Sequence, residues 1–167
     1  MSSLRSLLEE LGFARVQTLL MSGNVVFESD GRKPTSLELV LEEATTRRLK
    51  VETDYFVRTA KEWSEIVAAN PFRREGKEDP GHLLVVCLKK AVTSSDVKAL
   101  QTAIRGPEIV RVEGRQAYIV YPDGVGRSKL TAALIEAKLG SRGTARNWNT
   151  VLKLAAMLTP EPGGAHK

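Results

Sequence analysis

The stretch that decides how the chain folds is YPDGVGRSKLT, residues 121–131, which joins a predicted strand to a predicted helix. Apolar residues occupy 117–121, as expected for a strand, and a helical pattern follows from Lys129. Between them stand two glycines, an arginine, a serine and a lysine. These residue types form either a phosphate-binding loop or an ordinary turn, and the order strand, loop, helix indicates mixed α and β structure.

The segments around this stretch continue the same alternation. Strands are predicted over residues 82–88, 109–112 and 116–121, the last two forming a hairpin around Glu113-Gly114-Arg115. Helices are predicted from Thr93 or Ser94 to about residue 104, over about 129–139 and over about 150–158. The polar residues 73–81 are predicted to be a loop and linker, and a Gly/Ser/Arg connection follows residue 139.

The first part of the chain opens on a helix. Its apolar positions recur at i, i+3, i+4 and i+7, namely Leu4, Leu7, Leu8 and Leu11. Two β-rich runs, 16–21 and 25–28, flank the turn formers Ser22-Gly23-Asn24 and predict a hairpin. A helix over about 37–49 and a strand over 51–58 follow. Thr59 and Glu62 then form a capping-box pattern that begins another helix.

The order of these elements predicts the fold class. The first half reads αββαβ, and the second half repeats βαββα after its leading helix. We therefore expect an α+β protein of two ferredoxin-like (split βαβ) halves, with antiparallel sheets covered by helices. The expected divisions are an N-terminal half over residues 1–58, which is incomplete, a C-terminal half over 59–158 and a disordered tail over 159–167.

The first half lacks the first strand that the split arrangement requires. That strand is central, so its loss should leave the strand over 51–58 with unpaired backbone groups. Two explanations stay open. Either the natural chain starts upstream of Met1, which we favour, or a second copy supplies a strand and forms a homodimer through the unpaired edge.

Composition indicates a globular protein. Hydrophobic residues make up 42% and charged residues 27% of the 167 residues. The sequence shows neither an apolar run of the roughly 20 residues that span a bilayer nor a signal-peptide pattern, so we expect a cytoplasmic protein with no membrane partner. The lone Cys87 lies in an apolar run and is expected to be a buried small hydrophobe.

The net charge of +5 is concentrated toward the C-terminus. Residues 1–100 hold 15 Lys and Arg against 15 Asp and Glu, whereas residues 101–158 hold nine against four. This asymmetry suggests an anionic partner, although a positive charge also serves solubility.

The stretch 121–131 carries the first candidate site. Gly124 and Gly126 permit close approach of a ligand to the backbone, Arg127 and Lys129 add charge, and Ser128 can cap the following helix. The stretch is not a Walker A loop, because the lysine follows Ser128 and precedes a leucine. Its residues suit either an anion site or a Pro-Asp-Gly turn before a capped helix.

The second candidate site precedes the last helix. Residues 144–150, TARNWNT, bring together Arg146, Asn147, Trp148 and Asn149. Either asparagine can cap the helix, and the indole can anchor the segment in the core. If this helix start lies beside that of residue 129, then Arg127, Lys129, Arg146 and Lys153 could surround one phosphate-bearing ligand, with Trp148 or Tyr121 stacking on a base.

The sequence gives little support to other chemistry. Its histidines, His82 in a predicted strand and His166 in the tail, assemble neither a catalytic triad nor a metal site. Ser22, Gly23 and Asn24 are explained by a turn, and the paired glutamates by exposed helix faces. We expect no metal and no cofactor, and the pattern leaves open whether the protein is an enzyme.

Several segments resemble a known family. LRSLLEELGF (4–13), LLMSGNVVFESD (19–30), VRTAKEWSEIVAANPF (57–72), YPDGVGRSKLT and ARNWNTVLKLAAML (145–158) are similar to the bacterial family labelled domain of unknown function 1697. The resemblance implies an α+β fold and supplies no activity. Members of the family usually begin with a strand and an Arg-Gly-Ile-Asn-Val-Gly-Gly type turn, which this sequence lacks.

Three functions remain open. The first is a binding protein that takes a phosphate-containing ligand, a nucleotide or nucleic acid, through residues 121–131 and 146–149. The second is an enzyme acting on a phosphorylated small molecule, with Arg127 or Lys129 stabilising negative charge and Asp123 transferring a proton. The third is an assembly module whose loop is purely structural.

Overall fold

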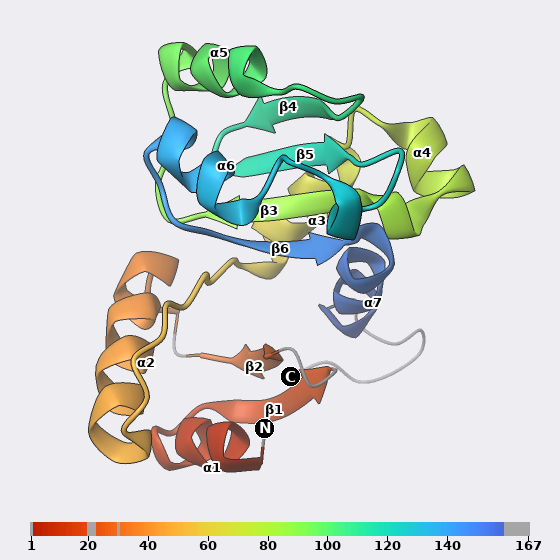
Figure 1. The fold of residues 1–167 in the computed structure, drawn as a ribbon. Helices are drawn as coiled ribbons and strands as arrows, with labels where there is room; N and C mark the ends of the chain where they lie inside the picture. Colours follow the sequence, from red (N-terminus) through yellow and green to blue (C-terminus); the bar gives the residue numbers. More distant parts are fainter. Residues whose placement is uncertain (1, 20–22, 30, 159–167) are drawn as a thin grey trace. The chain divides into compact units, whose positions relative to one another are not determined.

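The computed structural model describes residues 2–19, 23–29 and 31–158. The chain divides into two compact units, which we name unit 1 (Met1–Glu62 with Leu154–Lys167) and unit 2 (Trp63–Lys153). Each unit contains one antiparallel sheet with helices beside it, so the protein is of the α+β class (Figure 1). The predicted disordered tail, 159–167, lies outside the described residues.

Unit 1 begins with the predicted helix and hairpin. Helix α1 (Ser2–Glu10) is followed by β1 (Ala14–Leu19) and β2 (Asn24–Glu28), which pair antiparallel, and by α2 (Pro34–Leu49). The apolar spacing in α1 buries Leu7 and Leu8. The core of unit 1 joins both helices to the hairpin through Leu8, Phe13, Val16, Leu37 and Leu41.

The strand predicted over residues 51–58 is wrong, because this segment pairs with a helix instead of a sheet. The N–H of Tyr55 donates to the Glu42 carboxylate at 2.8 Å, and the N–H of Val57 donates to Glu38 at 2.7 Å. Glu38 and Glu42 are four residues apart, which is a rise of about 6 Å along a helix. Tyr55 and Val57 are two residues apart, which is about 6.6 Å along an extended chain. Because these two spacings are nearly equal, each glutamate can accept from one of the two N–H groups.

Because of this contact, the backbone N–H groups of Tyr55 and Val57 do not form an unpaired strand edge. The predicted unpaired N–H groups of Tyr55 and Val57 have acceptors within the chain. Tyr55 is held further by a 2.6 Å hydrogen bond between its hydroxyl and that of Thr45. Strand addition by a second copy is therefore not needed to satisfy them.

Unit 2 is built around a four-stranded antiparallel sheet. Its strands are β3 (Leu83–Leu88), β4 (Ile109–Glu113), β5 (Gln116–Val120) and β6 (Gly143–Asn147), arranged in the order β4-β5-β3-β6. Helix α5 (Ser94–Ala103) connects β3 to β4, and α6 (Ala132–Leu139) connects β5 to β6. The chain order is therefore β-α-β-β-α-β, one strand more than predicted.

Alternate residues of these strands face opposite sides of the sheet. One side packs beneath α5 and α6, with Val86, Ala117 and Ile119 in a shared core with Leu100 and Ile135 (Figure 1). On the other side, the buried hydroxyl of Tyr118 donates to the Ile66 carbonyl of α3 (Ala60–Ala68) at 2.6 Å. Burial raises the pKa of Tyr118 to about 12, because the sheet interior disfavours the phenolate.

Two segments predicted to be irregular are ordered elements. Residues 73–81 contain α4 (Arg73–Glu78) and the start of a 3-10 turn, η1 (Pro80–His82), and β6 occupies the predicted connection after residue 139. Gly76 permits a close approach, since a Cβ there would lie 3.0 Å from the indole nitrogen of Trp148. Within the described ranges, no helix has the length and apolar character needed to cross a membrane.

Candidate anion-binding site

Three segments meet at one end of the unit 2 sheet. Leu83 at the start of β3 is paired with Val120 at the end of β5, and Leu84 is paired with Asn147 at the end of β6. The stretch 121–131, the turn that ends at His82, and the start of α7 (Trp148–Leu158) therefore all emerge at this end (Figure 1). The two predicted sites belong to the same end of the sheet.

They are not adjacent, because β3 lies between β5 and β6. Two strand intervals separate their backbones by on the order of 10 Å. His82, which directly precedes β3, occupies the position between them. One ligand can reach both predicted segments only if it extends across the start of β3.

The stretch 121–131 begins with a buried anchor. Tyr121 is 2% exposed, and its hydroxyl donates to the Leu130 carbonyl at 3.0 Å. Burial, followed by the negative charge of Glu108, raises the pKa of Tyr121 to about 12. The backbone N–H of Tyr121 donates to the His82 carbonyl at 2.8 Å, which fixes the loop against the start of β3.

Ser128 does not cap the next helix as predicted. Helix α6 begins at Ala132, and the cap is Thr131, whose hydroxyl accepts from the N–H of Leu134. The Ser128 hydroxyl accepts from the Leu130 N–H at 2.9 Å and donates to the Glu108 carboxylate at 2.8 Å. Lys129 therefore lies before the helix, and Ser128 is engaged with an acidic partner.

The positive charge of the stretch comes from Arg127 and Lys129. Arg127 ends the short turn η2 (Val125–Arg127), and both Arg127 and Lys129 are exposed. Among the described residues, neither has a carboxylate within ion-pair distance. Their charge is therefore available to an external anion.

Most side chains of the second predicted segment, residues 144–150, form contacts within the protein. The Asn147 side chain accepts from the N–H of Thr150 at 3.0 Å and caps α7, which confirms one of the two predicted caps. The Arg146 guanidinium donates to the Thr144 hydroxyl at 2.8 Å and to the Ala145 carbonyl at 2.7 Å. Desolvation lowers the pKa of Arg146 below its usual range, with Cys87 opposing weakly. Asn149 is exposed.

The prediction that an aromatic side chain stacks on a base is wrong. Trp148 is 6% exposed, and Tyr121 is buried as well, so neither presents a ring face to solvent. The expectation that Trp148 anchors the segment in the core is confirmed.

His82 and Asp79 form a pair that the sequence analysis did not find. The His82 Nδ1 atom lies 2.9 Å from the Asp79 carboxylate, across one turn of η1. Its Nε2 atom faces Gly124, where a Cβ would lie 3.7 Å away. The Asp-Pro-Gly-His order of residues 79–82, with the two titratable groups three apart in a turn, is the signal that could have identified it.

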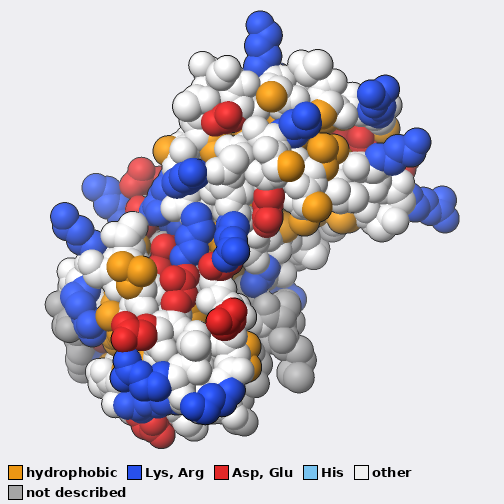
Figure 2. All heavy atoms as spheres, turned by 60° about the vertical axis from the view of Figure 1, so that its left-hand side comes forward, with side chains coloured by type: hydrophobic (Ala, Val, Ile, Leu, Met, Phe, Trp, Pro, Cys, Tyr) orange, Lys and Arg blue, Asp and Glu red, His pale blue; other side chains and the backbone are white. Residues whose placement is uncertain are grey.

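Basic and acidic side chains are mixed on one face of the protein. On the face shown in Figure 2, Lys and Arg side chains lie in small groups with acidic side chains among them.

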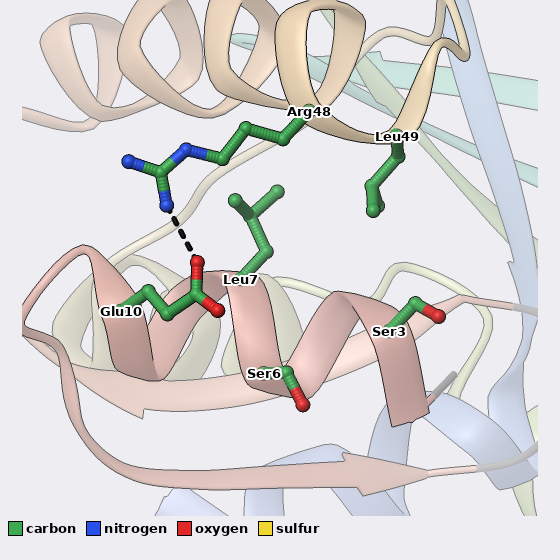
Figure 3. A pocket seen from close by; sticks show the side chains of 6 residues that line it. All are labelled: Ser3, Ser6, Leu7, Glu10, Arg48 and Leu49. Atoms are coloured by element: carbon green, nitrogen blue, oxygen red, sulfur yellow. Dashed lines mark hydrogen bonds and ion pairs between the residues drawn. The ribbon is translucent and has the colours of Figure 1, made fainter.

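A hollow lies in unit 1 between α1 and α2. It has a volume of about 340 Å³ and is lined by Ser3, Ser6, Leu7, Glu10, Arg48 and Leu49 (Figure 3). Its one guanidinium, that of Arg48, donates to the Glu10 carboxylate at 2.6 Å. Because that charge is already neutralised, the hollow is a weaker candidate for an anion.

The two glycines of the stretch should respond differently to substitution. Gly124 has φ +86°, which an L-residue adopts only with strain, whereas Gly126 has an ordinary φ and open space at its Cβ position. We expect Gly124→Ala to lower the free energy of unfolding by about 1 to 2 kcal/mol and Gly126→Ala by less than about 0.5 kcal/mol. Thermal and urea unfolding of both variants measure this, and equal effects would contradict the assigned role of Gly124.

These features define an α+β protein with two antiparallel sheets and a cation-bearing loop at one end of the larger sheet. The chain belongs to the family described as Protein of unknown function (DUF1697), which matches residues 1–118. The loop 121–131 and residues 146–149 lie beyond the matched range.

Among solved structures, the conserved bacterial protein SP0830 from Streptococcus pneumoniae shares the fold, with a TM-score of 0.74 and 18% sequence identity over 95% of this chain and 88% of that chain. At this identity the likeness concerns the fold alone. No curated protein matches the sequence.

Proposed function

We propose that the end of the unit 2 sheet binds a phosphate-containing anionic ligand, with Arg127 and Lys129 as its charged contacts. The observation that carries this proposal is the pair of exposed cations without a described carboxylate partner, held on a loop that Tyr121 anchors to the core. The N–H of Gly124 donates to the Tyr121 carbonyl at 3.0 Å and that of Ser128 to the Val125 carbonyl at 3.1 Å, so the two cationic side chains supply the main contacts, and charge-assisted hydrogen bonds to phosphate are the strong ones.

The contributions of the predicted residues are unequal. The Ser128 hydroxyl is hydrogen-bonded to Glu108, and Asn147 caps α7, so both side chains already have partners within the protein. Arg146 would have to leave its contacts with Thr144 and Ala145 to reach a ligand. Asn149 is exposed and could contact a ligand long enough to cross the start of β3.

A binding function is better supported than the enzyme alternative with Asp123 as the proton-transfer group. Asp123 is exposed, and among the described residues it has no hydrogen-bond partner that would orient it. A general acid or base needs a fixed position within reach of the reacting proton.

We infer that unit 2 is a ferredoxin-like domain, because its β-α-β-β-α-β order and its sheet order β4-β5-β3-β6 are those of a split βαβ arrangement. The cytoplasmic location stays a proposal.

Arg127→Ala and Lys129→Ala should each weaken ligand binding by roughly tenfold to a hundredfold, because each removes one charge-assisted hydrogen bond. A thermal-shift screen against nucleotides, phosphorylated metabolites, single-stranded DNA and RNA would identify the ligand. Steep loss of binding between low and physiological salt would indicate nucleic acid, since its affinity depends on counterion release.

Lys138→Ala is the matched control, since Lys138 is an exposed lysine in the last turn of α6, at the far end of that helix. Equal weakening in the Lys138→Ala variant would show that only net charge matters. Retention of full affinity by both loop variants would refute the assigned contacts.

A further inference from the structure

The two ring nitrogens of His82 have different surroundings: Nδ1 is hydrogen-bonded to Asp79, and Nε2 has no such partner among the described contacts and faces Gly124. Its Nδ1 atom lies 2.9 Å from Asp79 Oδ2, and the backbone N–H of His82 donates to the Asp79 carbonyl at 3.1 Å. An ionised carboxylate can only accept, so Nδ1 carries the proton in this contact. The Nε2 atom is then the one that can meet a ligand.

The Nε2 atom faces the candidate anion site. Gly124 is the residue opposite it, and a Cβ added there would lie 3.7 Å from Nε2, in van der Waals contact, so this nitrogen is next to the loop that carries Arg127 and Lys129. The loop cannot swing away freely, because the Tyr121 N–H is bonded to the His82 carbonyl and the Tyr121 ring is buried. The His82 side chain is 42% exposed, which gives a ligand access.

We propose that His82 is an additional ligand-binding residue of this site, and that binding of the anion is coupled to uptake of a proton by its imidazole. This inference rests on the proposed function of the loop. When both ring nitrogens carry protons, Nδ1 donates to Asp79 and Nε2 donates to an oxygen of the anion. The bound anion then adds a negative charge beside Nε2 that the free site lacks, and this charge favours the imidazolium.

The neighbouring charges set the size of the coupling. Asp79 contacts the ring, and the elements next to its turn carry further charged groups: Arg73, Arg74, Glu75, Lys77 and Glu78 on α4, Arg146 on β6, and Asp123 and Arg127 on the loop. Glu78 is paired with Arg74, and Arg146 is bonded to its own strand. Asp79 is the acidic group in direct contact with the ring, so it is the positioning residue.

The coupling is measured with sulfate, which keeps the same charge between pH 5.5 and 8. In the full chain we expect sulfate to bind about tenfold more tightly at pH 5.5 than at pH 8, and the midpoint of the His82 titration, followed by NMR, to rise by about one pH unit in saturating sulfate. The chain has two histidines, so His166→Gln assigns the signals and serves as the control.

Two substitutions separate the roles. His82→Gln should reduce the affinity ratio between the two pH values to less than about twofold, and Asp79→Asn should reduce it partly, since the amide still accepts from Nδ1 without its charge. An unchanged ratio in His82→Gln, with sulfate still bound at residues 124–129, would overturn the role of His82 alone. Failure of sulfate and of every phosphate compound to bind at the loop would overturn the proposed function as well.

Discussion

Replacing Trp148 by alanine should lower the free energy of unfolding by about 3 to 5 kcal/mol, because it empties a large buried volume. The indole is 6% exposed and lies against Gly76, which has no side chain to fill the space. The rigid turn of residues 70–72, closed by bonds between the Asn70 side chain and the Phe72 backbone, limits collapse around the cavity. Urea unfolding followed by circular dichroism measures the loss.

Leu152→Ala is the control for this substitution. Leu152 lies on the same helix but is 42% exposed, so its truncation should cost less than about 1 kcal/mol. Similar losses for the two variants would mean that Trp148 does not anchor the start of α7 in the core.

Replacing Glu38 by alanine should lower the free energy of unfolding by about 3 to 5 kcal/mol, because it removes one member of a buried ion pair. The carboxylate lies 3.9 Å from the Arg58 guanidinium, with both side chains at most 6% exposed, and it accepts the Val57 N–H. Glu38→Gln should cost less, since its amide oxygen can still accept that N–H.

Glu43→Ala is the control, because it removes an exposed glutamate from the same helix. Glu43 lies on the same helix in an exposed i,i+4 pair with Arg47, and its loss should cost less than about 0.5 kcal/mol. If Glu38→Ala were equally mild, residues 51–58 would not depend on α2 as a substitute for a neighbouring strand.

Local patterns predicted the elements whose stabilising contacts are local. The capping box of Thr59 and Glu62 is present as two reciprocal hydrogen bonds, and the pattern from Thr93 caps α5. The hairpin of β4 and β5 follows from alternating apolar residues on both sides of a Gly-containing turn. These features depend on residues a few positions apart.

The wrong predictions depend on distant contacts. Residues 51–58 have the composition of a strand, but glutamates of α2 take the N–H groups that a neighbouring strand would bind. Strand β6 has few β-formers, and it is ordered by pairing with the apolar strand β3. The local sequence could therefore predict neither the extended segment 51–58 nor strand β6.

The same division holds for the candidate site. The Asn147 cap and the burial of Trp148 followed from adjacent residues. The hydrogen bond from Ser128 to Glu108, in contrast, joins positions 20 apart, and Ser128 does not cap the next helix as expected. His82 was assigned to a strand, but it ends a turn in which Asp79 can reach it. The helix start was misplaced by three residues because Thr131, like Ser128, is a good cap.

Amide chemical-shift mapping tests the anion site most directly. The uniformly ¹⁵N-labelled protein is titrated with pyrophosphate at fixed pH and ionic strength, and the titration is repeated with Lys129→Ala and Lys138→Ala. We expect saturable shifts centred on residues 124–129, with smaller shifts at His82 and Asn149, and we expect these shifts to need more pyrophosphate in Lys129→Ala but not in Lys138→Ala. Saturable shifts confined to the unit 1 hollow around Ser6 and Arg48, or none at residues 124–129, would contradict the proposed anion site.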